Sequence, residues 1–173
     1  MKQNINKSYK EKIYLMPGKL IIADTPMHVW TVLGSCIAII FHSKRLNASA
    51  ICHAKLPVSP INNKMCSFKC LVHCNVKSAE CNFDYVTCSL KYMYENFIKL
   101  GALKSEIEIS LFGGSTVTSS GYRRNSIGYK NIQIAEELLR KKGLKISNKQ
   151  VGGEKGRTIN FYTDTGEIEI KVH

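Results

Sequence analysis

The chain has 173 residues, of which 44% are hydrophobic and 22% are charged, a composition typical of one soluble globular domain. No apolar run approaches the roughly 20 residues needed to cross a bilayer, and residues 1–12 are polar and basic. We therefore expect no membrane insertion and no secretory signal, but a cytoplasmic protein whose cysteines are mostly reduced. The net charge of +12 favours an acidic partner, while the scattered lysines argue against specific nucleic-acid binding.

Hydrophobic periodicity and turn residues divide the chain into short strands and two longer helices. We expect an N-terminal arm over residues 1–16, followed by a single domain over residues 17–173. Strands are predicted at 19–23, 29–33, 36–41, 49–53, 107–112, 144–146, 158–162 and 167–172, and helices at 85–100 and 127–142. Strands dominate, so the pattern predicts an α+β fold with a mixed or antiparallel sheet and two main helices.

The stretch from Gly34 to Cys36 leads directly into a buried, β-branched strand. A glycine turn holds the Cys36 thiol rigidly and brings free backbone N–H groups close to it, as acyl chemistry on a thiol requires. His53 ends the next predicted strand, and antiparallel pairing of the two strands would bring it beside Cys36. By residue type alone, each side chain is more often structural than catalytic. Cys52, next to His53, is expected to face the other side of the sheet.

Residues 60–82 form a cysteine-rich segment without sustained periodicity. Four thiolates within it could enclose a tetrahedral zinc ion, with His73 as an alternative ligand: Cys66, Cys70, Cys74 and Cys81. The spacing is not that of a standard zinc knuckle, so unligated thiols remain the other interpretation. A zinc ion there would be structural, because the chemistry predicted at Cys36 needs no cofactor.

Several separate motifs, in the same order along most of the chain, resemble the chemoreceptor glutamine deamidase (CheD) family. They are Leu33-Gly34-Ser35-Cys36, His53-Ala54-Lys55-Leu56-Pro57 and Phe112-Gly113-Gly114. The resemblance implies an α/β sandwich with the active cysteine at one end of the sheet. It also implies hydrolysis of receptor glutamine to glutamate through a cysteine thioester, and in some members hydrolysis of methyl esters.

The resemblance implies roles for individual residues. Cys36 would be the nucleophile, stabilised as a thiolate by an imidazolium at His53, which then protonates the leaving nitrogen. The family's third residue is a threonine six positions before the cysteine, where this chain has Trp30. We expect Thr31, one position later, to orient His53, although a one-residue shift reverses the face of a strand.

Glycine and serine residues flanking the thiol complete the predicted site. The backbone near Gly34 and Ser35 would bind the oxyanion. Gly113 and Gly114 would allow close backbone approach beside the site, or would form only a tight turn after a strand.

The partners implied are methyl-accepting chemoreceptors as substrate and a CheC-type chemotaxis phosphatase as regulator. Two alternatives remain open at the level of sequence. The first is a catalytically inactive CheD-like binding module that docks on chemoreceptors or on a CheC-type phosphatase. The second is a zinc-dependent nucleic-acid protein.

Overall fold

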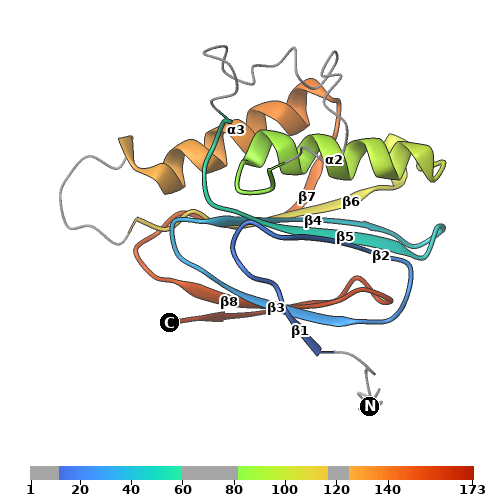
Figure 1. Cartoon of the computed structure of the whole chain (residues 1–173), viewed down its shortest axis with the longest axis horizontal. Coiled ribbons are helices and arrows are strands. Elements are labelled where there is room, and N and C mark those ends of the chain that lie inside the picture. The colour runs from blue at the N-terminus through green and yellow to red at the C-terminus, as the bar shows by residue number, and fades with distance from the viewer. Residues whose placement is uncertain (1–11, 60–81, 117–124) are drawn as a thin grey trace.

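A computed structural model describes residues 12–59, 82–116 and 125–173 as three layers. Two helices cover one face of a five-stranded sheet, and a four-stranded sheet packs against its other face (Figure 1). The elements are β1 (Lys12–Tyr14), β2 (Leu20–Ala23), β3 (His28–Leu33), β4 (Ile37–Ser43), β5 (Ala48–Ala54), α2 (Val86–Lys99), the 3-10 turn η3 (Lys104–Glu106), β6 (Glu108–Gly113), α3 (Ile127–Lys141), β7 (Ile146–Val151), β8 (Arg157–Tyr162) and β9 (Ile168–Val172).

Both sheets mix antiparallel and parallel pairing. The strand order is β2-β5-β4-β6-β7 in the larger sheet and β1-β3-β8-β9 in the smaller one. The β6–β7 and β1–β3 pairs are parallel, and the remaining pairs are antiparallel. This arrangement confirms the predicted α+β sandwich with two main helices.

Strands β4 and β5 are buried on both faces, which explains why the sequence shows continuous apolar runs there. From β4, Ile37, Ile39 and Phe41 face the helices, whereas Ala38 and Ile40 face the smaller sheet. Strand β4 is also the middle strand of its sheet. Cys36, which directly precedes β4, is therefore held at the start of a central strand that is buried on both faces.

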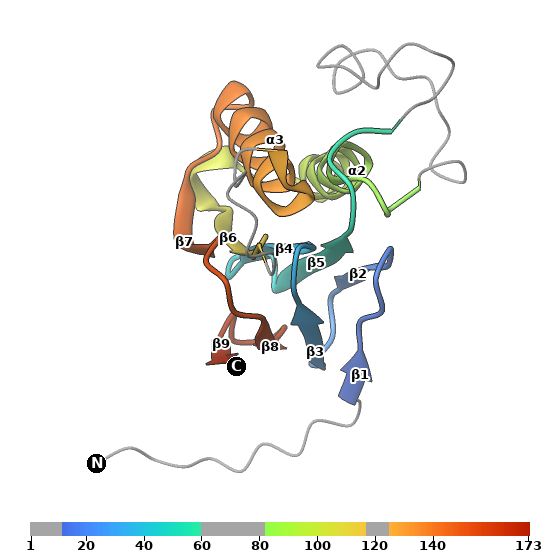
Figure 2. The ribbon, with the colours of Figure 1, turned by 90° about the vertical axis from the view of Figure 1, so that its left-hand side faces the viewer.

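The two predicted helices are present within one or two residues of their expected ends. Each has an apolar stripe that packs on the larger sheet, and each is followed by a glycine with positive φ, Gly101 and Gly143. Neither described helix is long and apolar enough to span a bilayer. Viewed from the side, both helices lie on one face of the larger sheet, and the smaller sheet lies on the other face (Figure 2).

Two details differ from the sequence expectations. Residues 12–14 form strand β1, and Leu15 is buried, so the folded part begins before the expected end of the arm at residue 16. The strand expected at 144–146 instead runs from Ile146 to Val151. It is an edge strand with exposed polar side chains, so it lacks the apolar pattern on which the prediction relied.

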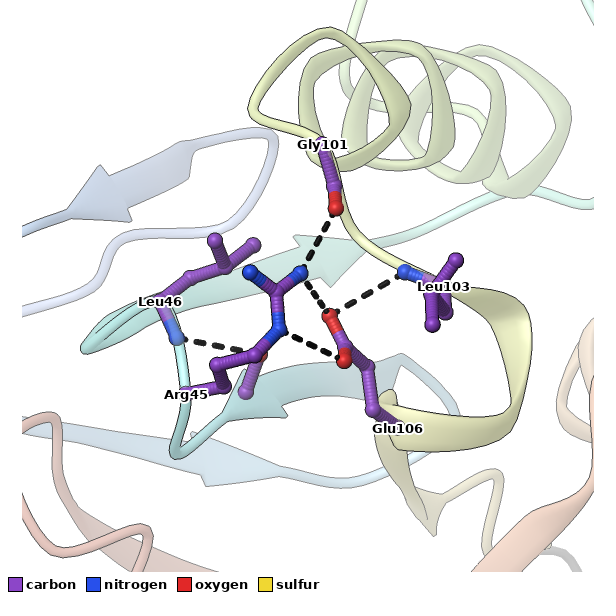
Figure 3. Close-up of polar contacts among 6 residues, drawn as sticks. Arg45, Leu46, Gly101, Leu103 and Glu106 are labelled. Atoms are coloured by element: carbon purple, nitrogen blue, oxygen red, sulfur yellow. Dashed lines mark hydrogen bonds and ion pairs between the residues drawn. The ribbon is translucent and has the colours of Figure 1, made fainter.

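An ion pair lies at the end of the larger sheet that is remote from Cys36. Arg45, in the β4–β5 turn, donates to both carboxylate oxygens of Glu106 at 2.9 and 2.6 Å and to the Gly101 carbonyl at 2.7 Å (Figure 3). The pair ties that turn to the α2–β6 connection and lowers the pKa of Glu106. Its distance from the start of β4 marks it as structural support rather than part of the site.

Candidate active site

The segment from Gly34 to Cys36 carries the chain from one sheet to the other. Strand β3 ends at Leu33 in the smaller sheet, and β4 begins at Ile37 in the larger one. Cys36 is a free, half-buried thiol that packs against the apolar cluster between the sheets. The crossover thus holds a cysteine at the edge of the sandwich without enclosing it.

The strand register puts Cys36 and His53 on the same face of the larger sheet. Ala38 lies opposite His53 in the β4–β5 ladder, and Cys36 lies two residues before Ala38. Such diagonal neighbours are about 7–8 Å apart, within reach of long side chains. Cys52 faces the helices instead, as predicted, and its burial raises the pKa of its thiol to about 12.

Thr31 contacts His53 from the opposite sheet. Its Oγ1 lies 2.7 Å from His53 Nδ1 and donates to the Leu15 carbonyl at 2.7 Å. Because the hydroxyl proton is given to Leu15, Oγ1 must accept from Nδ1–H, which leaves Nε2 as the basic nitrogen. His53 is 2% exposed, and among the described residues Nε2 has no hydrogen-bond partner.

The register explains why Thr31, rather than Trp30, faces the histidine. On β3, Val29, Thr31 and Leu33 are buried between the sheets. Trp30 lies on the outer face of the smaller sheet, where the centroids of the Trp30 and Tyr14 rings are 4.5 Å apart. Thr31, and not Trp30, is therefore the residue of β3 that contacts His53.

Burial shifts the pKa values of both candidate catalytic groups in the directions that disfavour charge. Desolvation raises the pKa of the Cys36 thiol, partly opposed by the positive charge of Lys55. Desolvation also lowers the pKa of His53. These shifts favour a neutral thiol and a neutral imidazole at rest, whereas the sequence predicts a thiolate–imidazolium pair.

Gly113 and Gly114 bring β6 against the backbone of Cys36. Gly113 has φ of +100°, and a Cβ there would lie 2.3 Å from the Cys36 carbonyl oxygen. The Gly114 N–H donates to that oxygen at 2.7 Å, and the Ser115 N–H donates to the Gly34 carbonyl at 2.8 Å. The N–H groups of Gly114 and Ser115 are therefore occupied, and Gly113 allows the close approach of the two backbones.

The N–H groups of Ser35 and Cys36 are candidate oxyanion donors at the turn. Within the ranges that the structure covers, neither donates to a carbonyl group. Ser35 is exposed and Cys36 is half-buried, so these donors lie beside the sulfur at the surface. An oxyanion formed at Cys36 could accept from them.

Asn131 fixes the two strands that carry the site, and sequence analysis assigned it no role. Its side-chain nitrogen donates to the Ser35 carbonyl at 3.1 Å and to the Lys55 carbonyl at 2.9 Å. Asn131 is fully buried on α3, so it holds the turn before Cys36 and the end of β5 at a set separation. The Leu15 carbonyl is a second unanticipated contributor, because a backbone acceptor carries no residue-type signal.

The four predicted zinc ligands, Cys66, Cys70, Cys74 and Cys81, lie outside the described residues, and zinc there stays a prediction. The described residues on either side of this segment pair with each other, because Leu56 and Tyr85 form a parallel bridge. In the three ranges that are described, no group of three or more His, Cys, Asp or Glu side chains is arranged to hold a metal ion.

Comparison with known proteins places the chain in one family. The family described as "CheD chemotactic sensory transduction" matches residues 73–172. A Geobacter sulfurreducens protein named "Probable chemoreceptor glutamine deamidase CheD 2" is 34% identical over 159 residues, which are 92% of this chain and 88% of that protein. A Maridesulfovibrio salexigens protein named "Probable chemoreceptor glutamine deamidase CheD" is 35% identical over 170 residues, which are 96% and 94% of the two chains.

The similarity reaches archaea. A Methanococcus maripaludis protein, also named "Probable chemoreceptor glutamine deamidase CheD", is 26% identical over 154 residues, which are 89% of this chain and 90% of that protein. The family match, the coverage of nearly whole chains and the α+β sandwich agree with one another. This chain belongs to the CheD family.

Proposed function

We propose that this protein hydrolyses the side-chain amide of glutamine residues in methyl-accepting chemoreceptors, producing glutamate and ammonia. The observation that carries the proposal is the hydrogen-bonded series from Leu15 through Thr31 to His53. It fixes a basic Nε2, which has no hydrogen-bond partner among the described residues, on the sheet face that also carries Cys36. The names of the relatives supply the substrate class.

The first half of the reaction forms a thioester. Cys36 Sγ attacks the amide carbon and its proton passes to His53 Nε2, while the carbonyl electron pair moves onto oxygen. The oxyanion accepts from the N–H groups of Ser35 and Cys36. When the intermediate collapses, His53 protonates the nitrogen, the C–N bond breaks and ammonia leaves.

The second half regenerates the thiol. Water attacks the thioester carbon and gives a proton to His53, and the C–S bond then breaks. The proton returns to sulfur, and glutamate is released. Throughout, Thr31 accepts from Nδ1–H and so keeps Nε2 as the proton-transferring nitrogen.

The substrate is a protein surface rather than a small molecule. Cys36 is half-buried and Ser35 is exposed, so the reacting glutamine would come from a side chain presented on a helix of the receptor. The net charge of +12 raises the rate of encounter with an acidic receptor surface. We place the reaction in the cytoplasm and retain a CheC-type phosphatase as the proposed regulatory partner.

Deamidation of a receptor fragment tests the proposal. Wild-type protein is incubated with a glutamine-containing cytoplasmic fragment of a chemoreceptor, and ammonia and the glutamine-to-glutamate mass change are measured. Cys36→Ala should abolish both while still binding the fragment. Cys52→Ala, which removes the buried thiol on the helix side of the sheet, should retain activity.

Two outcomes oppose the proposal. Deamidation by Cys36→Ala at the wild-type rate would assign the chemistry to another group. Binding of the fragment without ammonia release from wild type would favour the inactive binding module.

A further inference from the structure

A lysine lies beside Cys36 at the start of β4. Ile37 and Ala54 are the last pair of the β4–β5 ladder, and Cys36 and Lys55 are the residues next to that pair on the two segments. The Asn131 side chain donates to the Ser35 and Lys55 carbonyls at 3.1 and 2.9 Å, so the two segments stay close together past the end of the ladder. The charge of Lys55 acts on the Cys36 thiol at this point.

Asp84 holds this lysine in place. The Lys55 Nζ lies 2.9 Å from Asp84 Oδ1, and the side chains are 41% and 30% exposed. The Asp84 carbonyl accepts from the N–H groups of both Lys55 and Leu56, at 2.8 and 2.9 Å. Backbone and side-chain contacts thus join the same two residues, which fixes the ion pair more firmly than an isolated surface pair.

The turn before β2, at Gly18, packs against the Asp84 carboxylate. A Cβ at Gly18 would lie 2.0 Å from Asp84 Oδ1, so the glycine backbone lies directly against that group. The Gly18 N–H in turn donates to the His53 carbonyl at 2.7 Å. The ion pair is therefore packed into the same corner of the fold as the catalytic histidine.

We propose that Lys55, held by Asp84, is a positioning residue that sets the reactivity of Cys36 by placing a positive charge near its sulfur. The inference deepens the proposed function, since it takes Cys36 as the nucleophile. A cation there stabilises negative charge on sulfur as the thiol proton leaves and on the oxyanion that follows. Asp84 moderates that effect, because its charge has the opposite sign.

The charges that face Cys36 agree with this assignment. Burial has the largest effect and raises the pKa of the Cys36 thiol, Lys55 lowers that pKa, and Asp84 raises it by a smaller effect. His53 lies on the same face, and its own burial favours the neutral imidazole. Lys55 is thus the cation acting on this sulfur within the part of the chain that the structure covers.

Alkylation of Cys36 measures this effect without any receptor. The rate of carboxamidomethylation by iodoacetamide is followed from about pH 6 to 10, and the Cys36 peptide is quantified by mass spectrometry so that other thiols do not contribute. Lys55→Met should move the midpoint to higher pH and slow alkylation at pH 7.5 about three- to tenfold. Lys55→Arg keeps the positive charge and should stay close to wild type.

A matched control uses the far end of the same strand pair. Lys44 is also a lysine in an ion pair, 3.7 Å from Glu108, but it lies in the β4–β5 turn. Lys44→Met should leave the Cys36 midpoint unchanged, and urea unfolding should show that each variant is folded.

A higher midpoint in Lys55→Met, with Lys55→Arg close to wild type, supports the proposal. It is overturned if Lys55→Met leaves the midpoint unchanged or lowers it, or if Lys55→Arg shifts the midpoint as far as Lys55→Met. Because the assay needs only the thiol, it can succeed or fail independently of deamidase activity.

Discussion

At the scale of single residues, the hydroxyl of Thr31 determines which nitrogen of His53 carries the proton. Thr31→Val removes this acceptor at nearly constant volume and leaves Nδ1–H without its closest partner. We expect the turnover rate to fall about 100-fold, because proton transfer by a positioned base contributes roughly that much or more. Deamidation kinetics measure the loss, and ¹⁵N NMR of the His53 ring reports the tautomer.

Thr31→Ser is the matched control, because it keeps the hydroxyl and should retain most of the activity. An unchanged tautomer and rate in Thr31→Val would mean that the Leu15 carbonyl, 3.4 Å from Nδ1, orients the ring by itself.

Gly113 is the second residue on which the site depends, because its backbone approaches Cys36 too closely for a side chain. Gly113→Ala would place a methyl group 2.3 Å from the Cys36 carbonyl oxygen at a φ of +100°. We expect a loss of about 3 kcal/mol or more in the free energy of unfolding, together with a loss of Cys36 reactivity.

Urea denaturation measures that loss against a second glycine. Gly143 also has positive φ, +69°, but apart from its chain neighbours no atom of the described residues lies within 4 Å of the Cβ position, so Gly143→Ala should cost only about 1–2 kcal/mol. Equal costs at the two positions would show that the close approach to Cys36 is unimportant.

At the scale of elements, α3 holds the site together through Asn131. Asn131→Asp keeps the shape but replaces the donor with oxygen facing two carbonyl groups. We expect a loss of about 2–3 kcal/mol in the free energy of unfolding and slower alkylation of Cys36, because the Ser35 and Lys55 carbonyls lose their partner.

An asparagine on the other helix provides the comparison. The Asn96 side chain donates to the Tyr92 carbonyl within α2, at 2.8 Å, and bridges no site segments among the described residues, so Asn96→Ala should leave alkylation unchanged. An Asn131→Asp variant as stable and as reactive as Asn96→Ala would contradict the assigned role.

Elements with an internal pattern could be predicted from the sequence, and elements defined by a neighbour could not. The apolar runs of β4 and β5 and the helical spacing in α2 and α3 reflect burial that each segment carries in its own residues. Strand β7 is polar and exists because β6 offers it a free edge. Strand β1 is three residues long and is defined by parallel pairing with β3.

The site residues also fall into two groups, those that a local motif predicted and those that depend on contacts between distant segments. Cys36 and His53 could be proposed from motifs, and their shared face followed from a short antiparallel connection. The contact with Thr31 joins two sheets, and only the register of both could decide whether Thr31 or Trp30 faces the histidine. Lys55 lies within the motif that begins at His53, but its role, like those of Asn131 and Asp84, depends on contacts between distant segments that no local spacing shows.

At the scale of the whole molecule, two buried histidines link stability to pH. Desolvation lowers the pKa of both His42 and His53 below the ordinary value of 6.5. Below pH 6.5 the unfolded chain therefore binds protons that the folded protein does not, and stability falls as the pH falls. We expect the free energy of unfolding to drop between about pH 7 and pH 5.5, by up to about 1.4 kcal/mol per pH unit for each histidine.

Urea titrations at several pH values in this range measure how steeply the free energy of unfolding changes with pH. His42→Gln should reduce that slope by up to about 1.4 kcal/mol per pH unit, which corresponds to one bound proton. His42 lies at the end of β4 remote from Cys36 and contacts Ser49 at 2.8 Å, so this variant separates stability from catalysis. A stability that stays constant from pH 7.5 to 5.5 would contradict the burial effect on both rings.

The account as a whole depends on a covalent bond forming at one thiol. Acid quenching of the reaction between wild-type protein and a chemoreceptor fragment, followed by peptide mass spectrometry, tests this directly. We predict a thioester between Cys36 and the reacting glutamine position, with the mass of ammonia lost. Conversion of that glutamine to glutamate with the acyl group on another side chain, or at full rate in Cys36→Ala, would contradict the account.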